Sequence, residues 1–191
     1  MPPSTPNNYR QRAANAQVAD SAGRIAPRDT RLEAAVLGAL MLEKDAYTIV
    51  CDILHADSFY EPAHQRIYEA IQTLGASQSP IDMLTVVEQL RLNGTLESVG
   101  GTAYVAQLTM EVASAANVEF HARIVAQKYL SRQLIGFASE LETKAFDESI
   151  DVDDVLQEAE GRLFEISQRN VKKEVTQIDP CLLYTSPSPR D

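Results

Sequence analysis

Few residues in this chain could bind a metal ion or act as general bases, and they lie far apart. The histidines are His55, His64 and His121, and no two of them have the i, i+4 spacing of an HExxH motif. That spacing places two metal ligands on one face of a helix. We therefore expect no metal site, and for His64 a structural role, either facing solvent or capping a neighbouring element.

Acidic pairs are the next candidates, because two carboxylates can divide general acid and general base work. Glu140 with Glu142, and Asp153 with Asp154, are the clearest pairs. One carboxylate of a catalytic pair needs a desolvated pocket that shifts its pKa. These pairs lie among other charged residues on helix faces expected to be solvated, so we interpret them as surface residues.

Motifs for nucleotide chemistry and for nucleophilic catalysis do not occur. No glycine is followed by lysine, which excludes a GxxxxGK[ST] phosphate loop, and neither GxSxG nor a dinucleotide fingerprint is present. Cys51 lies in the apolar stretch TIVCDIL without a close cation to stabilise a thiolate, so we expect it to be buried and inert. The residues alone predict no catalytic, cofactor-binding or metal-binding site and favour a helical interaction module.

Hydrophobic periodicity predicts the elements that would position any such surface. Apolar residues recur at three- and four-residue steps from Leu32 to Met41, after Asp29 or Thr30 as N-cap. Further helices are expected at 45–54, 62–75, 81–92 and 103–110, with Leu84, Val87 and Leu90 forming the apolar face of the fourth. No stretch alternates with a period of two, so the predicted fold class is all-α.

Two longer helical stretches follow, at about 117–146 and from 152 onward, separated by the polar break DESIDVDD. Aspartates at the start of the second stretch suit a helix N-terminus. The pattern predicts a small helical globule (27–112) followed by a long antiparallel helical hairpin (113–169). Because two helices alone bury little core, the apolar stripe of the hairpin packs either within its own chain or against a copy from another chain.

The termini and the charge limit the class of partner. Residues 1–26 are polar and are expected to form a flexible arm, whose arginines serve solubility or, alternatively, a weak contact with DNA. The net charge is −10, and most acidic residues follow position 31, so the folded part should repel phosphate backbones and bind a protein instead. The apolar run at 34–42 is too short for a bilayer and no signal peptide is evident, so we expect no membrane association and a cytoplasmic location.

Six short segments of the sequence are informative because of the order in which they occur. They are APRDTRLEAAVLGALML, DSFYEPAHQRIYEAI, PIDMLTVVEQL, GGTAYVAQL, AANVEFHARIV and LQEAEGRLFEI. Each is weak by itself, but six in one order with compatible spacing are hard to obtain by chance. Together, over about residues 25–168, they resemble the N-terminal domain of the bacterial replicative DNA helicase, the DnaB family.

The resemblance implies a helical globule and hairpin, then a linker and a RecA-like ATPase domain that is missing from this chain. In the family, six subunits form a ring that encircles single-stranded DNA and unwinds the duplex at the replication fork, using ATP and Mg²⁺ in the missing domain. The N-terminal domains pair through their hairpins into a collar that receives primase, and a helicase loader is a further candidate partner. DNA would be bound mainly by the missing domain, and this chain alone should be inactive.

The resemblance also implies structural duties for individual residues. The residues expected to anchor the core of the globule are Phe59, Tyr60, Ile67 and Tyr68, with His64 at the start of the helix between them. Asn117 would cap the long helix. The residues expected to pack, either within the hairpin or across a dimer, are Leu130, Leu134, Leu141, Leu156 and Leu163.

The end of the chain departs from the family pattern. Residues 170–180 resemble the start of the linker, whereas residues 181–191, CLLYTSPSPRD, carry no apolar period. Back-translation of this segment gives a string that resembles the end of a transposon-derived sequencing adapter. We therefore interpret 181–191 as an artefactual, adapter-encoded tail, and the chain as truncated before the ATPase domain.

Three hypotheses follow. The first is a fragment of a ring helicase, and the second is a stand-alone helical dimerisation or adaptor protein without enzymatic activity. The third, an unrelated enzyme, is the least favoured because no convergent polar constellation is evident. Sequence downstream of Asp179 separates the first two, because a helicase must continue into a phosphate-binding loop.

Overall fold

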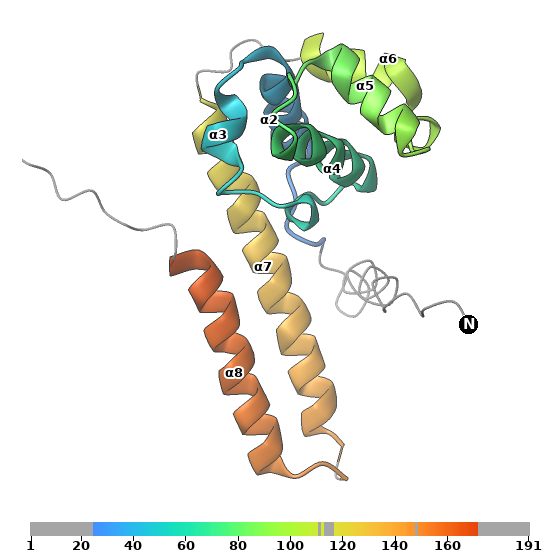
Figure 1. Ribbon diagram of the computed structural model, residues 1–191. Coiled ribbons are helices and arrows are strands. Elements are labelled where there is room, and N and C mark those ends of the chain that lie inside the picture. Colours follow the sequence, from blue (N-terminus) through green and yellow to red (C-terminus); the bar gives the residue numbers. More distant parts are fainter. Residues whose placement is uncertain (1–24, 111, 113–116, 148, 172–191) are drawn as a thin grey trace, which may run out of the picture.

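A computed structural model describes residues 25–110, 112, 117–147 and 149–171, and every regular element among them is helical (Figure 1). The expected tail, most of the arm and most of the linker lie outside these residues. The elements are α2 (Thr30–Leu42), α3 (Ala46–Val50), η1 (Ala56–Ser58), α4 (Pro62–Ala76), α5 (Met83–Leu92), η2 (Glu97–Val99), α6 (Gly101–Met110), α7 (Val118–Ala145) and α8 (Val152–Val171). The predicted all-α class is confirmed.

Helix α2 runs through the middle of the globule. It begins where Oδ1 of Asp29 accepts a hydrogen bond from the Leu32 amide at 3.1 Å, which satisfies one of the free amides of the first turn. From residue 33 to residue 41, all but one of its side chains are buried, so it has no polar face of its own. A Cβ built on Gly38 would lie 2.2 Å from the Leu108 carbonyl oxygen, so the glycine allows α6 to pack closely.

Helix α4 contributes a further set of buried side chains to the core. Pro62 occupies its first turn, where the missing amide costs nothing. The rings of Phe59 and Tyr68 lie 5.0 Å apart, and the Tyr68 hydroxyl donates to the Leu54 carbonyl at 3.0 Å. A buried hydroxyl that has found its acceptor adds packing without a desolvation penalty.

Two predicted helices differ from the structure. The one expected at 45–54 ends at Val50, because the chain then turns tightly and the amides of Ile53 and Leu54 both bond to the Val50 carbonyl. The fourth helix begins at Met83, with Asp82 as its N-cap, so Val86, Val87 and Leu90 face the core. Leu84, which was expected on that face, is 72% exposed.

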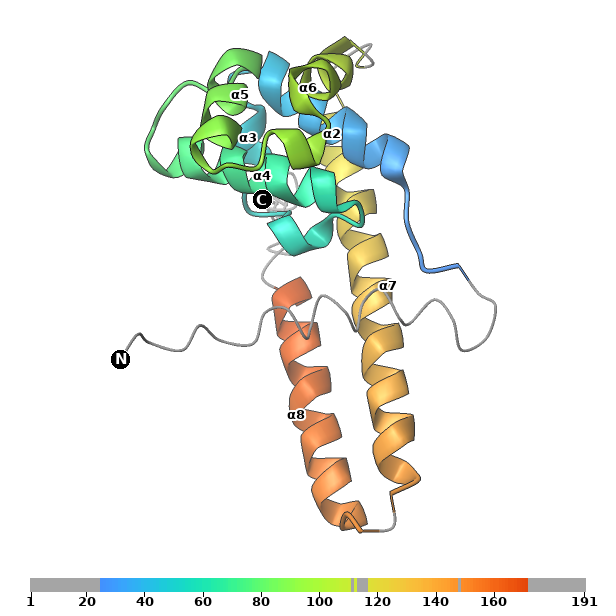
Figure 2. The ribbon, with the colours of Figure 1, turned by 90° about the vertical axis from the view of Figure 1, so that its right-hand side faces the viewer.

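The hairpin extends away from the globule (Figures 1 and 2). The first turns of α7 lie within the globule, where Val118, Ala122 and Val125 are buried. The rest of α7 leaves the globule, and α8 returns beside it in the antiparallel direction. Asn117 stands at the N-cap position of α7 without a side-chain capping bond, contrary to the expected cap. None of the described helices combines the length and apolar character that a membrane span requires.

Candidate functional site

The two faces of the hairpin differ in polarity and burial. Between α7 and α8, Val155 is buried, and Phe137, Leu141 and Ala159 line the interface beside it. Lys144 Nζ lies 2.6 Å from Glu158 Oε1 across this interface, and the lysine lowers the pKa of the Glu158 carboxyl. These contacts hold the two helices together.

A second apolar face, called here the outer face, lies beside that interface on α8 and is exposed. Val152, Leu156 and Leu163 are 71%, 56% and 50% exposed, and their spacing places them on one side of α8. The other large apolar side chains exposed on α7, on α8 and between them are Phe120, Leu134, Ile135, Phe146 and Phe164. The apolar stripe of the sequence is therefore divided between an inner face that closes the hairpin and an outer face that no other described residue of the chain covers.

The five predicted hairpin residues fall into two groups. Leu130 and Leu141 are half-buried, and Leu141 lies at the interface of the helices. Leu134, Leu156 and Leu163 are exposed. Only the first group has its packing accounted for within the chain, which leaves the second group available to a partner.

The four predicted core residues also divide. Phe59, Ile67 and Tyr68 are buried almost completely. Tyr60 is half-buried and serves a different contact, because the guanidinium carbons of Arg28 and Arg132 lie 4.9 and 5.6 Å from its ring centroid. Its ring face thus attracts two cations at the base of the hairpin, a position that suits the π-electron cloud of a phenol ring.

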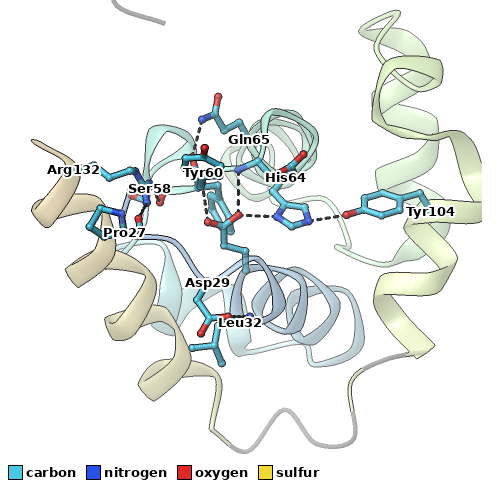
Figure 3. Close-up of polar contacts among 12 residues, drawn as sticks. Pro27, Asp29, Leu32, Ser58, Tyr60, His64, Gln65, Tyr104 and Arg132 are labelled. Atoms are coloured by element: carbon cyan, nitrogen blue, oxygen red, sulfur yellow. Dashed lines mark hydrogen bonds and ion pairs between the residues drawn. The ribbon is translucent and has the colours of Figure 1, made fainter. Parts of the chain in front are cut away.

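A buried polar network crosses the globule (Figure 3). The Glu33 carboxylate accepts hydrogen bonds from the Tyr60 amide at 2.8 Å, from the Glu61 amide at 3.3 Å and from His64 Nδ1 at 2.8 Å. The other ring nitrogen, Nε2, lies 2.8 Å from the Tyr104 hydroxyl and accepts from it in the tautomer whose proton is on Nδ1. The network joins α2, α4 and α6.

The network corrects the expectation for His64, whose side chain is 2% exposed and neither faces solvent nor caps a helix. Every buried polar side-chain atom among the described residues has at least one hydrogen-bond partner. A satisfied buried network of this kind specifies one packing arrangement.

Arg132 forms the junction between globule and hairpin. Its guanidinium donates to the Pro27 carbonyl at 2.9 Å and to the Ser58 carbonyl at 2.8 Å. Burial lowers the pKa of Arg132, and the Glu33 carboxylate opposes that effect. The planar fork of arginine suits two carbonyls at once, which a lysine ammonium cannot match.

The residues considered above as metal ligands, general acids or bases, or nucleophiles do not form a shared site among the described residues. No cluster of three or more histidine, cysteine or acidic side chains that could hold a metal occurs within the described part of the chain. Glu140, Glu142, Asp153 and Asp154 are exposed. Cys51 is half-buried rather than buried, and its thiol donates to the Thr48 carbonyl at 3.4 Å.

The sequence interpretation missed Glu33, Tyr104 and Arg132. Glu33 carried a signal, because it is a lone acid in the otherwise apolar run LEAAVLGALML and α2 leaves it no polar face. Arg132 and Tyr104 carried none, because their partners lie 74 and 40 positions away along the chain.

Comparisons with known proteins agree on one family. Residues 25–127 match the family described as DnaB-like helicase N terminal domain. The replicative DNA helicase DnaB of Rhodothermus marinus is 42% identical over 92% of this chain and 19% of its own length. The replicative DNA helicase DnaC of Bacillus subtilis (strain 168) is 36% identical over 85% of this chain and 36% of its own length. The chain thus spans about a third or less of these relatives.

Solved structures show the same fold. The crystal structure of the N-terminal domain of DnaB helicase from Mycobacterium tuberculosis superposes with a TM-score of 0.70 at 35% identity, covering 74% of this chain and 99% of that one. A DnaB-like replicative helicase whose structure was described together with its interactions with primase gives a TM-score of 0.61 at 24% identity, over 79% of this chain and 36% of that one. From its helical globule, its projecting hairpin and these matches, the chain belongs to the DnaB-like helicase N-terminal domain family.

Proposed function

We propose that this chain is the N-terminal part of a hexameric, ATP-dependent replicative DNA helicase that unwinds duplex DNA at the replication fork in the cytoplasm. Within that helicase, the segment serves ring assembly and the docking of primase. The observation that carries the proposal is the outer apolar face of α8, formed by Val152, Leu156 and Leu163, in a chain of this family.

The outer face favours pairing with a second copy of the same hairpin. A two-helix hairpin that buries Val155 and little else between its helices has a small core of its own. Two hairpins packed face to face would form a four-helix arrangement, in which each large apolar side chain contributes about 1.5 to 3 kcal/mol on full burial. Pairing related by twofold symmetry uses the same patch on both copies, so a single stripe is sufficient.

The remaining duties belong to other surfaces or to other parts of the helicase. Primase docking is supported by the relative whose structure is described with its interactions with primase. These 191 residues contain no phosphate-binding loop, so ATP and Mg²⁺ would be bound elsewhere in the helicase, which would also make most of the DNA contacts. A loader protein is a further proposed partner, and the chain alone is expected to hydrolyse no ATP.

The pairing is tested by charging the outer face. A variant carrying Leu156→Asp and Leu163→Asp is compared with a control carrying Gln157→Asp, which adds a charge at an exposed position of the same helix. Sedimentation velocity over a range of concentrations should show association for the wild type and the control, and monomers for the double variant. Equal helix content by circular dichroism shows that the hairpin remains folded. Association of the double variant at wild-type concentrations would contradict the pairing.

The helicase assignment has a separate test. Sequence read past the codon for Asp179 should continue into a strand followed by GxxxxGK[ST], and the extended protein should hydrolyse ATP and unwind a forked duplex. A natural stop codon after Asp191 in independent DNA molecules would instead support the adaptor hypothesis.

A further inference from the structure

A short backbone segment, Ser58 to Glu61, is held by side chains from two distant helices. The Ser58 carbonyl accepts from Arg132 of α7, and the amides of Tyr60 and Glu61 donate to Glu33 of α2. The segment therefore lies between a carboxylate inside the globule and a guanidinium at the base of the hairpin (Figure 3). Movement of either side chain changes the hydrogen bonds available to the same few peptide groups.

Each side chain that holds the segment leads to another part of the molecule. On the globule side, Glu33 continues through His64 to the hydroxyl of Tyr104, a half-exposed residue of α6. On the hairpin side, Arg132 also binds the Pro27 carbonyl and lies over the rings of Tyr60 and Tyr129. Contiguous polar contacts thus run from the surface of α6 to the point where α7 leaves the globule.

Because Arg132 lies where α7 leaves the globule, a small tilt of the helix at Arg132 displaces the far end of the hairpin by a larger distance. Above it, α7 is fixed by Val118, Ala122 and Val125 in the core, and below it the helix packs mainly against α8. About 20 Å of helix separates Arg132 from Ala145 at the end of α7. A tilt of about 10° at Arg132 would therefore move the end of α7 by about 3 Å.

We propose that residues 58–61 couple the Glu33–His64–Tyr104 network to the direction of the hairpin. A change at Tyr104 shifts the hairpin, and a change at Arg132 alters the network, because a coupling free energy is reciprocal. The surface of α6 around Tyr104 is then a control point for hairpin direction. The proposal concerns the single chain, so it stands or falls independently of helicase function.

A double-mutant cycle tests the coupling. The variants are Tyr104→Phe, which removes only the hydroxyl, Arg132→Lys, which replaces the two guanidinium nitrogens that bind the two carbonyls by a single ammonium nitrogen, and the combination. We expect the equilibrium constant of urea unfolding to depart from additivity by about fivefold or more. Additivity within roughly twofold would overturn the proposal. The control cycle pairs Tyr104→Phe with Arg123→Lys, which lies on α7 like Arg132 but whose guanidinium binds the exposed Glu119 one turn away, and this cycle should be additive.

A distance measurement distinguishes coupling from a general loss of stability. Spin labels are attached through Ala76→Cys on α4 and Ala145→Cys at the end of α7, in the full chain carrying Cys51→Ser and Cys181→Ser, and measured under dilute conditions. Pulsed electron resonance should show that Tyr104→Phe shifts or broadens the distance distribution by about 3 Å or more. Arg132→Lys should change it in the same direction. An unchanged distribution for Tyr104→Phe would overturn the proposal even if Arg132→Lys failed to fold.

Discussion

The Glu33 carboxylate lies 2.8 Å from Nδ1 of His64, and both side chains are almost fully buried, at 1% and 2% exposure. A buried charge that loses its hydrogen-bond partners costs much more than an exposed one, because water cannot replace them. The same carboxylate also accepts from the two amides that precede α4. Glu33 thus fixes, from another helix, the backbone that leads into α4.

Replacing Glu33 by glutamine should therefore destabilise the globule strongly. The amide presents one acceptor and one donor where three donors converge, so we expect a loss of about 2 to 3 kcal/mol in the free energy of unfolding. Urea denaturation of Glu33→Gln measures it. The control is Glu119→Gln, which breaks an exposed i, i+4 ion pair on α7 and should cost less than about 0.5 kcal/mol. Similar losses in the two variants would contradict the role given to Glu33.

Replacing Gly38 by alanine should lower the stability of the protein, whereas replacing Gly136 by alanine should raise it. At Gly38 the new methyl group would lie 2.2 Å from the Leu108 carbonyl oxygen, so α6 must move, and we expect a cost of about 2 kcal/mol or more. At Gly136, within α7, nothing lies within 4 Å of the added carbon, and the higher helix propensity of alanine should raise stability by up to about 1 kcal/mol. Thermal melting under dilute conditions checks both. Equal shifts of the melting temperature in the two variants would show that α2 and α6 pack less closely than the Gly38–Leu108 contact indicates.

Tyr68 should make the stability of the protein fall at high pH. Burial, with a smaller effect of Tyr47, raises the pKa of Tyr68 above its ordinary value of 10.0 in the folded chain. The unfolded chain then loses the phenolic proton first as the pH rises through about 10, and the free energy of unfolding declines by up to about 1.4 kcal/mol per pH unit. Below about pH 9 this contribution is fully present. Urea melts at pH 8 and pH 11 should differ less for Tyr68→Phe than for the wild type.

Substitutions at Val155 and Leu156, which are neighbours on α8, should distinguish packing within the hairpin from association between copies of the chain. Val155→Asp places a charge between α7 and α8 and should reduce the stability of the hairpin by several kcal/mol. Leu156→Asp, on the outer face, should change the melting of dilute monomer by less than about 1 kcal/mol, and Leu134→Asp on α7 should behave alike. Circular dichroism melts at low concentration measure both effects. Severe destabilisation of the monomer by Leu156→Asp would place that residue in the hairpin interior.

Periodicity was sufficient for most of the helices and for the hairpin, because helix formation depends on residues that are near one another in the sequence. Asp29 before Leu32 and Pro62 at the start of α4 act within one turn of helix. The helix predicted at 45–54 was too long because a tight turn at Val50 brings Ile53 and Leu54 into the core, and apolar residues in a turn look the same in sequence as those in a helix.

The polar network and the division of the hairpin stripe depended on distant contacts. Leu156 and Val155 are adjacent and equally apolar, yet one is 56% exposed and the other 8%. Only the rotation of α8 against α7 decides which of them turns inward, and periodicity does not give that angle. For His64, burial followed from a partner 31 positions earlier.

Because α7 is continuous, an insertion or deletion within it changes the orientation of the hairpin relative to the globule. One unbroken helix of 28 residues carries both the core residues of the globule and the inner face of the hairpin. Each residue inserted between Arg132 and Phe137 would turn the hairpin about 100° around the axis of α7 relative to the globule and move its end by about 1.5 Å. Insertions there preserve the angular register to within about 20° only at lengths such as about seven, eleven or eighteen residues, whereas the turn between α7 and α8 can grow or shrink without rotating either face.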